Sequence, residues 1–211
     1  MNRVVCWVFR VGFIGALLAS CSTDPGDLSS PAPSTIFGNP DYRAISYDGY
    51  RGLTREDAPT VEQLVDDVKI LAAMNIKLLR TYNTSQFPQA ERLLQAIREV
   101  KSKDPSFEMY VMLGAWIESK NAWTEAVWNP ETNAWVEGTG PDHTQGNVEN
   151  NSQEIATAIR LANEYRDIVK AIAVGNEAMV QWAVTYFVYP ETILRWICLL
   201  YTSPSPRDIG E

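Results

Sequence analysis

The chain has 211 residues, 45% hydrophobic and 21% charged, which is enough apolar material for a buried core. Its 18 Lys and Arg residues are outnumbered by 26 Asp and Glu residues, and the formal net charge of −8 without a basic cluster argues against binding to nucleic acid. The single histidine, His143, is a poor basis for a zinc site or a Ser-His-Asp triad, and we predict neither a metal nor a cofactor.

The N-terminus has the pattern of a bacterial lipoprotein signal. Arg3 and Arg10 flank a mostly apolar run that is too short to be a confident membrane span. The run ends in Leu-Ala-Ser-Cys at residues 18–21, which resembles the lipobox, in which the cysteine is acylated and becomes the first residue of the mature protein. We therefore predict a signal peptide over residues 1–21 and lipidation of Cys21. An ordinary signal peptide that contains a cysteine is the alternative.

Residues 22–40 are rich in Ser, Pro, Asp and Gly, a composition that is typical of a flexible tether. The acyl chains on Cys21 would hold the following domain at a membrane without spanning it. The predicted location is therefore the bacterial outer membrane or cell surface, with the domain facing the periplasm or the exterior.

Residues 41–197 are predicted to form one domain in which strands and helices alternate. Four short apolar segments are predicted to be strands, at residues 44–47, 76–82, 109–116 and 169–174. The third is a continuous apolar run, as expected of a strand that is buried on both faces.

Helix patterns separate these strands. Thr60 begins the first helix, and Gln63 completes a capping box with it. Pro88 begins the second helix, and Asn151 with Glu154 resembles a capping box at the start of the third.

A long insertion, from about residue 117 to residue 146, follows the third strand and contains three tryptophans. Trp123, Trp128 and Trp135 would either stack on sugars over the functional face or form a small core for the loop itself. We slightly favour the second interpretation for each of them, because such a loop must bury something to stay ordered.

Strand–helix alternation predicts parallel strands joined by crossover helices. An open doubly wound sheet and a (β/α)₈ barrel both fit this pattern. No glycine-rich phosphate-binding sequence follows the first strand, so nucleotide binding loses support.

The ends of the predicted strands carry the residues whose side chains could bind a ligand or take part in catalysis. In parallel α/β folds, functional groups lie where the strands end. Here these ends carry aromatic rings, an arginine, asparagines and carboxylates, in the segments 47–50, 80–83, 114–116 and 176–177. This mixture suits a sugar, because rings stack on C–H faces and polar groups bind hydroxyls. Structural roles as core caps or helix caps are the alternative.

Three of these segments resemble the strand motifs of glycoside hydrolase family 17. They are Ala-Ile-Ser-Tyr-Asp-Gly-Tyr-Arg (44–51), Leu-Leu-Arg-Thr-Tyr-Asn (78–83) and Val-Gly-Asn-Glu-Ala (174–178), which are similar to the first, second and fourth strand motifs. The resemblance covers roughly residues 44–197 and implies a (β/α)₈ TIM barrel that acts on β-1,3-glucan.

The resemblance implies a retaining double displacement in which Glu177 is the acid/base, with a pKa raised enough to hold a proton near neutral pH. Asn176 would bind the sugar 2-hydroxyl and Arg80 would orient neighbouring groups. Tyr47 and Tyr82 would line the cleft. Trp116 is added as a substrate-binding residue from its rim position alone, and Asp48 and Tyr50 are weaker candidates on the same ground.

The family's nucleophile is a glutamate on the seventh strand, about 5 Å from the acid/base. This chain stops near the end of the fourth βα unit, so we expect a truncated barrel that lacks the nucleophile and is inactive on its own. Residues 198–211 resemble a translated sequencing adapter, and the native gene is expected to continue beyond Ile197. A glucan transglycosylase and a non-catalytic carbohydrate-binding lipoprotein remain as alternative functions.

Overall fold

The computed structural model describes residues 30–202. The predicted signal peptide, the lipidation site Cys21, the first part of the tether (residues 22–29) and residues 203–211 of the predicted non-native tail lie outside the described residues. Within residues 30–202, none of the helices is long and apolar enough to span a membrane.

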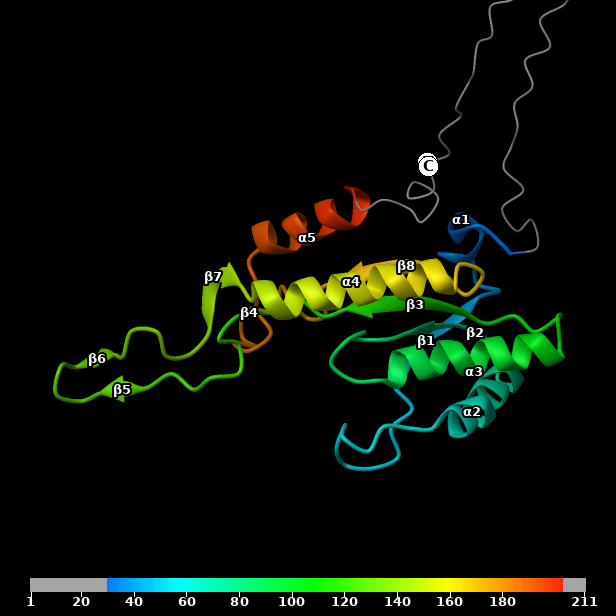
Figure 1. The fold of residues 1–211 in the computed structure, drawn as a ribbon, viewed down its shortest axis with the longest axis horizontal. Helices are drawn as coiled ribbons and strands as arrows, with labels where there is room; N and C mark the ends of the chain where they lie inside the picture. The colour runs from blue at the N-terminus through cyan, green and yellow to red at the C-terminus, as the bar shows by residue number, and fades with distance from the viewer. Residues whose placement is uncertain (1–29, 203–211) are drawn as a thin grey trace, which may run out of the picture. The chain divides into compact units, whose positions relative to one another are not determined.

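The centre of the fold is a four-stranded parallel sheet (Figure 1). Its strands lie in the order β1 (Arg43–Ser46), β2 (Ile76–Arg80), β3 (Tyr110–Ala115) and β8 (Val169–Val174). The four predicted strands are confirmed, with ends that differ by at most two residues. Because the strands follow one another in chain order, the described sheet has no reversal of the kind that creates the switch point of a doubly wound sheet.

Three helices connect these strands: α2 (Val61–Ala73), α3 (Gln89–Lys103) and α4 (Val148–Glu164). The capping box of α2 is confirmed, because the Thr60 side chain accepts from the Gln63 amide and the Gln63 side chain accepts from the Thr60 amide. A short helix, α1 (Pro33–Ile36), precedes β1, and α5 (Pro190–Thr202) follows β8. Helix α5 thus continues five residues past Ile197, where we placed the end of the native domain.

The predicted capping box at the start of α4 is wrong. The N-cap is Asn147, whose side chain accepts from the Asn150 amide, and the helix begins at Val148. Asn151 and Glu154 therefore lie inside α4, where both side chains are buried. Their side chains bind other segments of the chain. The spacing of the two residues resembled a helix cap, but the residues make tertiary contacts instead.

The main core lies between the sheet and its helices. Leu79, Val111 and Leu113 are fully buried on the sheet face that packs against α2, α3 and α4. On the opposite face, Leu78 and Tyr110 pack against Ile36 of α1. Burial on both faces agrees with the continuous apolar character of β3.

Gly114 allows the chain after β2 to pass close over β3. A Cβ atom built at Gly114 would lie 2.3 Å from the carbonyl oxygen of Thr81. The Gly114 amide donates to the Thr81 hydroxyl at 3.0 Å. The close backbone approach determines where the residues that follow β2 are placed, and no residue with a side chain fits at this position.

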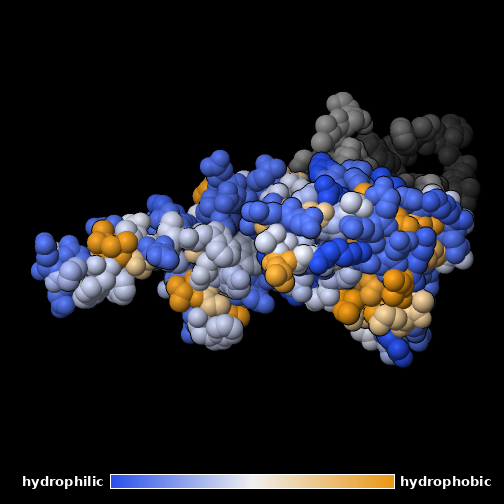
Figure 2. Space-filling view, turned by 90° about the horizontal axis from the view of Figure 1, so that it is seen from below, coloured by the Kyte–Doolittle hydropathy of each residue, from blue (hydrophilic) through white to orange (hydrophobic). Residues whose placement is uncertain are grey.

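The insertion after β3 forms two small antiparallel pairs. Strand β4 (Ser119–Lys120) pairs with β7 (Asp142–Gly146), and β5 (Trp128–Asn129) pairs with β6 (Ala134–Trp135). The β5–β6 hairpin extends away from the sheet in Figure 1. Apolar side chains on the face shown in Figure 2 form separate small patches, and the exposed apolar residues of the hairpin are Val127, Trp128, Trp135 and Val136.

Candidate functional site

The carboxyl ends of β2 and β8 bring Arg80 and Asn176 together. An Arg80 guanidinium N–H donates to Asn176 Oδ1 at 2.6 Å, and the guanidinium lies 5.3 Å from the centre of the Tyr82 ring. Asn176 is buried, whereas Arg80 and Tyr82 are half-buried. Three of the predicted site residues therefore form one contiguous cluster, although 96 positions in sequence separate Arg80 from Asn176.

Glu177 follows Asn176 and has an unusual backbone. Its φ angle is +52°, and the other three non-glycine residues with positive φ in the described chain are all asparagines. Asparagine adopts this conformation readily, but a glutamate in it is strained, and such strain is concentrated at functional sites. The side chain is exposed and makes no side-chain hydrogen bond to the other described residues. It is therefore accessible to a ligand at the strand ends.

Asp48 and Tyr50, in the loop after β1, each carry a buried oxygen atom that lacks a hydrogen-bond partner among the described residues. Burial raises the pKa of Asp48, and the positive charge of Arg55 partly opposes this effect. Burial and the nearby Asp48 charge raise the pKa of Tyr50 to about 12. Unpaired buried oxygens are costly unless a ligand satisfies them, so both residues remain candidates for binding hydroxyl groups.

Tyr47 is not part of the Arg80 cluster. Its hydroxyl donates to Asp67 of α2, and its ring packs against the core on the helix side of the sheet. Burial and the carboxylate of Asp67 raise the pKa of Tyr47. Periodicity placed Tyr47 at a strand end, but the loop after β1 directs its side chain towards α2.

Trp116, which follows β3, belongs to an aromatic cluster. Its ring lies 6.2 Å from that of Trp123, with an angle of 25° between their planes. The Tyr186 ring packs edge-on against both, at 5.1 and 5.8 Å. The Trp116 indole N–H is buried and has no partner among the described residues. Trp123 thus packs outside its own loop, whereas Trp128 and Trp135 contact each other within the hairpin at 5.1 Å.

Sequence reasoning missed Glu118, a buried carboxylate that joins three segments. It accepts from the Trp123 indole N–H at 2.7 Å and from the side chains of Asn147 and Asn150 at 2.8 and 2.6 Å. Its backbone N–H and C=O both bond to the side chain of Asn151. No local pattern marks these contacts, because their partners come from the insertion and from the start of α4.

Glu154 is a second buried carboxylate whose contacts are all structural. From α4 it accepts the backbone N–H groups of Thr84, Ser85 and Trp116 at 2.5, 2.8 and 3.0 Å, together with the Ser85 hydroxyl at 2.5 Å. It is 3% exposed. Glu154 therefore holds the segments after β2 and β3 in place beside the aromatic cluster, and its acceptor capacity is used within the protein.

The described residues contain no group of three or more His, Cys, Asp or Glu side chains that could hold a metal ion. His143 has a structural environment, because its Nδ1 lies 2.9 Å from the Phe187 carbonyl oxygen and its ring packs on that of Phe187.

No protein-family model matches this chain, and no curated protein matches it. Among solved structures, the chain is similar to the crystal structure of an endo-laminarinase from Formosa Hel1_33_131, with 46% sequence identity and a TM-score of 0.72. The match covers 84% of this chain and 42% of the other, so this chain spans less than half the length of the structure it matches. The mixed α/β fold with its parallel sheet is therefore similar to that of a glycoside hydrolase.

Proposed function

We propose that this chain is part of a glycoside hydrolase that cleaves β-1,3-glucan at the carboxyl ends of its parallel strands. The observation that carries the proposal is the Arg80–Asn176 contact beside the strained, exposed Glu177, in a chain that is 46% identical to an endo-laminarinase over 84% of its length. The sequential order of the four strands supports a (β/α)₈ barrel, of which the chain would supply about half. The proposal that the barrel belongs to family 17 rests on the resemblance of the motifs at residues 44–51, 78–83 and 174–178.

Asn176 and Arg80 would position the sugar next to the scissile bond. The Asn176 side-chain oxygen already accepts from Arg80, so its amide N–H groups are the part that can donate to a sugar hydroxyl. The contact also fixes the orientation of both side chains before substrate arrives. Such preorganisation reduces the entropy lost on binding.

Glu177 would act first as an acid and then as a base. It would donate a proton to the glycosidic oxygen as a second carboxylate attacks the anomeric carbon and the leaving sugar departs. It would then take a proton from water as that water displaces the carboxylate from the sugar, which restores Glu177 to its protonated form. Glu118 and Glu154 are poor nucleophiles because both are occupied by internal hydrogen bonds. We propose that the nucleophile lies on a strand outside this chain.

Product analysis tests the proposal and separates it from the alternatives. The protein encoded by the complete gene is incubated with laminarin, with and without an added acceptor oligosaccharide, and the products are resolved by chromatography. We expect shorter glucans with one new reducing end per cleavage. Longer products formed from the acceptor would indicate a transglycosylase, and binding without any product would indicate a carbohydrate-binding protein.

We also propose that Cys21 is acylated and tethers the domain to a membrane. The proposal rests on the lipobox-like Leu-Ala-Ser-Cys at residues 18–21. A bacterial host that expresses the chain is fed an alkyne-tagged fatty acid, and incorporation is measured after click labelling. We expect label on the wild-type chain and none on Cys21→Ser. Equal labelling of the two chains would exclude this site.

A further inference from the structure

We infer that the pocket between Trp116, Trp123 and the start of α4 is a second sugar-binding subsite, which holds one ring of the glucan chain away from Glu177. The inference rests on the proposed function, because it takes β-1,3-glucan as the ligand. The pocket has a volume of about 310 Å³. This size is at the lower end of the range for small-molecule sites, roughly 300–1,000 Å³, and suits a single sugar ring. Its lining consists of Ser85, Gln86, Trp116, Glu118, Trp123, Asn150, Asn151, Gln153 and Glu154.

The pocket and the proposed catalytic residues lie at the ends of two neighbouring strands of the sheet, β3 and β8. Ala115 pairs with Val174, and the Gly175 amide donates to the Ala115 carbonyl at 2.8 Å. Trp116 and Asn176, the next residues along each segment, therefore leave the sheet at the same edge. A glucan chain that contacts Asn176 can continue towards Trp116 without crossing the sheet.

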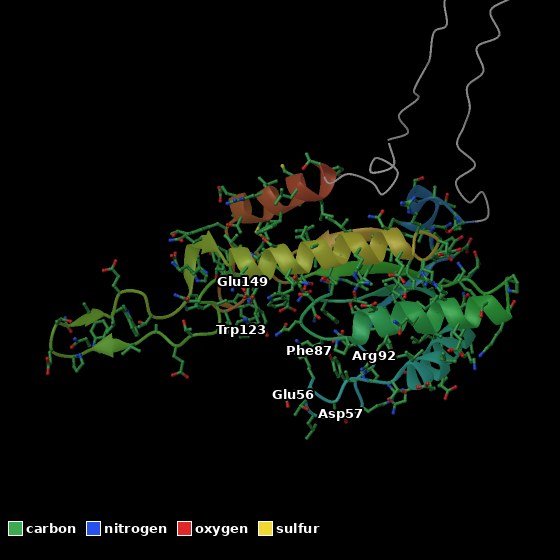
Figure 3. The ribbon with its side chains drawn as sticks, in the orientation of Figure 1. Glu56, Asp57, Phe87, Arg92, Trp123 and Glu149 are labelled. Atoms are coloured by element: carbon green, nitrogen blue, oxygen red, sulfur yellow. The ribbon has the colours of Figure 1, made fainter. Side chains whose placement is uncertain are left out.

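Trp123 has the exposure and the rigidity of a stacking platform. Its side chain is exposed, with 56% of the residue surface accessible, so the ring is not buried as part of a core. A flexible tryptophan would lose entropy on binding, but this ring is held by a 2.7 Å hydrogen bond to the buried Glu118 and by contact with Trp116. Trp123 lies beside the beginning of α4, near Glu149, in Figure 3. The protein thus holds an exposed apolar ring in one orientation beside a polar pocket.

The polar lining matches the hydroxyl groups of a neutral sugar. Gln86, Asn150 and Gln153 supply carboxamide groups, and no Lys or Arg is among the described residues that line the pocket. The two carboxylates of the lining, Glu118 and Glu154, are buried and already bonded within the protein. An anionic ligand would therefore have no cation to bind, which favours an uncharged polyol.

The unpaired indole N–H of Trp116 is the remaining observation. A buried donor without a partner lowers stability unless a ligand or a water satisfies it. The nitrogen is buried in the described structure, so a sugar hydroxyl in the pocket would accept this hydrogen bond after a small shift of the Trp116 ring or its neighbours. The same ring cluster would then contribute both a stacking face, from Trp123, and a polar contact, from Trp116.

Binding of a linear β-1,3-gluco-oligosaccharide, laminarihexaose, tests the inference. Isothermal titration is carried out on the protein encoded by the complete gene with Glu177→Gln, so that no oligosaccharide is consumed. We expect Trp123→Ala to weaken binding by about tenfold, which corresponds to about 1.4 kcal/mol. The matched control is Trp128→Ala, an exposed tryptophan of the same insertion that lies outside the pocket, and we expect it to bind like the parent.

Asn176→Ala separates this inference from the proposed function. Weaker binding by Asn176→Ala with unchanged binding by Trp123→Ala would overturn the second subsite alone. Weaker binding by Trp123→Ala alone would support the subsite and contradict the role of Asn176. Absence of binding by the parent chain would overturn both proposals.

A second readout observes the pocket with Trp116 and Trp123 both in place, and a substitution serves only to assign the signal. In a ¹H–¹⁵N spectrum, the indole resonance of Trp116, assigned from Trp116→Phe, should shift when laminarihexaose is added, because its N–H gains an acceptor. A Trp116 resonance that stays in place at saturating oligosaccharide would contradict the inference even if Trp123→Ala fails to fold.

Discussion

Replacing Glu177 with Gln in the protein encoded by the complete gene is expected to lower turnover of β-1,3-glucan by about 10²–10⁴-fold, the usual contribution of a general acid/base. Glutamine has nearly the same shape but carries no proton that it can transfer to the glycosidic oxygen. Because Glu177 is exposed and makes no side-chain hydrogen bond to the other described residues, the change should leave folding intact. The measurement is kcat/KM on laminarin, with the circular dichroism spectrum as a check of the fold.

The matched control for this experiment is Glu191→Gln, an exposed glutamate in the first turn of α5. It removes the same charge from the surface without touching the strand ends, and we expect full activity. Near wild-type turnover of unactivated laminarin by Glu177→Gln would rule out the acid/base role. An equal loss of kcat/KM in both variants would show that the effect comes from the change in charge or from misfolding, and not from the loss of proton transfer.

Replacing Glu154 with Ala is expected to lower the free energy of unfolding by about 3 kcal/mol. The change removes the charged acceptor of the Thr84, Ser85 and Trp116 backbone N–H groups, and each buried donor left without a partner costs about 1 kcal/mol or more. The carboxylate connects α4 to two loops that are separated from it by 38–70 positions in sequence. Its loss should therefore loosen the segments after β2 and β3 together.

Urea denaturation of the purified chain measures the loss, and Glu149→Ala is the control from the same helix. Glu149 is exposed in the first turn of α4 (Figure 3), so its removal should change stability by less than about 0.5 kcal/mol. Amide hydrogen exchange of Thr84, Ser85 and Trp116 gives a local readout that does not depend on the global transition. Unchanged exchange at all three amides in Glu154→Ala would show that the carboxylate does not hold these loops.

The sequence by itself determined the four strands of the central sheet, the helices between them and their order. Apolar runs of strand length, helical periodicity and the Thr60–Gln63 capping box are local signals, because each depends on residues a few positions apart. These signals placed all four strands of the sheet to within two residues. They also placed Arg80, Asn176 and Glu177 at strand ends, where a parallel sheet gathers functional groups on one edge.

Only the tertiary structure decided which side chains meet. Glu154 resembled the second half of a helix cap, yet it binds two distant loops, and Tyr47 at the end of β1 bonds to Asp67 of α2. Trp123 stands beside Trp116 because the buried Glu118 accepts its indole N–H. Each of these outcomes depends on how loops of different length return over the sheet and on which buried donors find an acceptor there. Local periodicity carries no information about the path of the loops or about the pairing of buried donors. The candidate functional residues could therefore be predicted from the sequence, but the side chains that they contact could not.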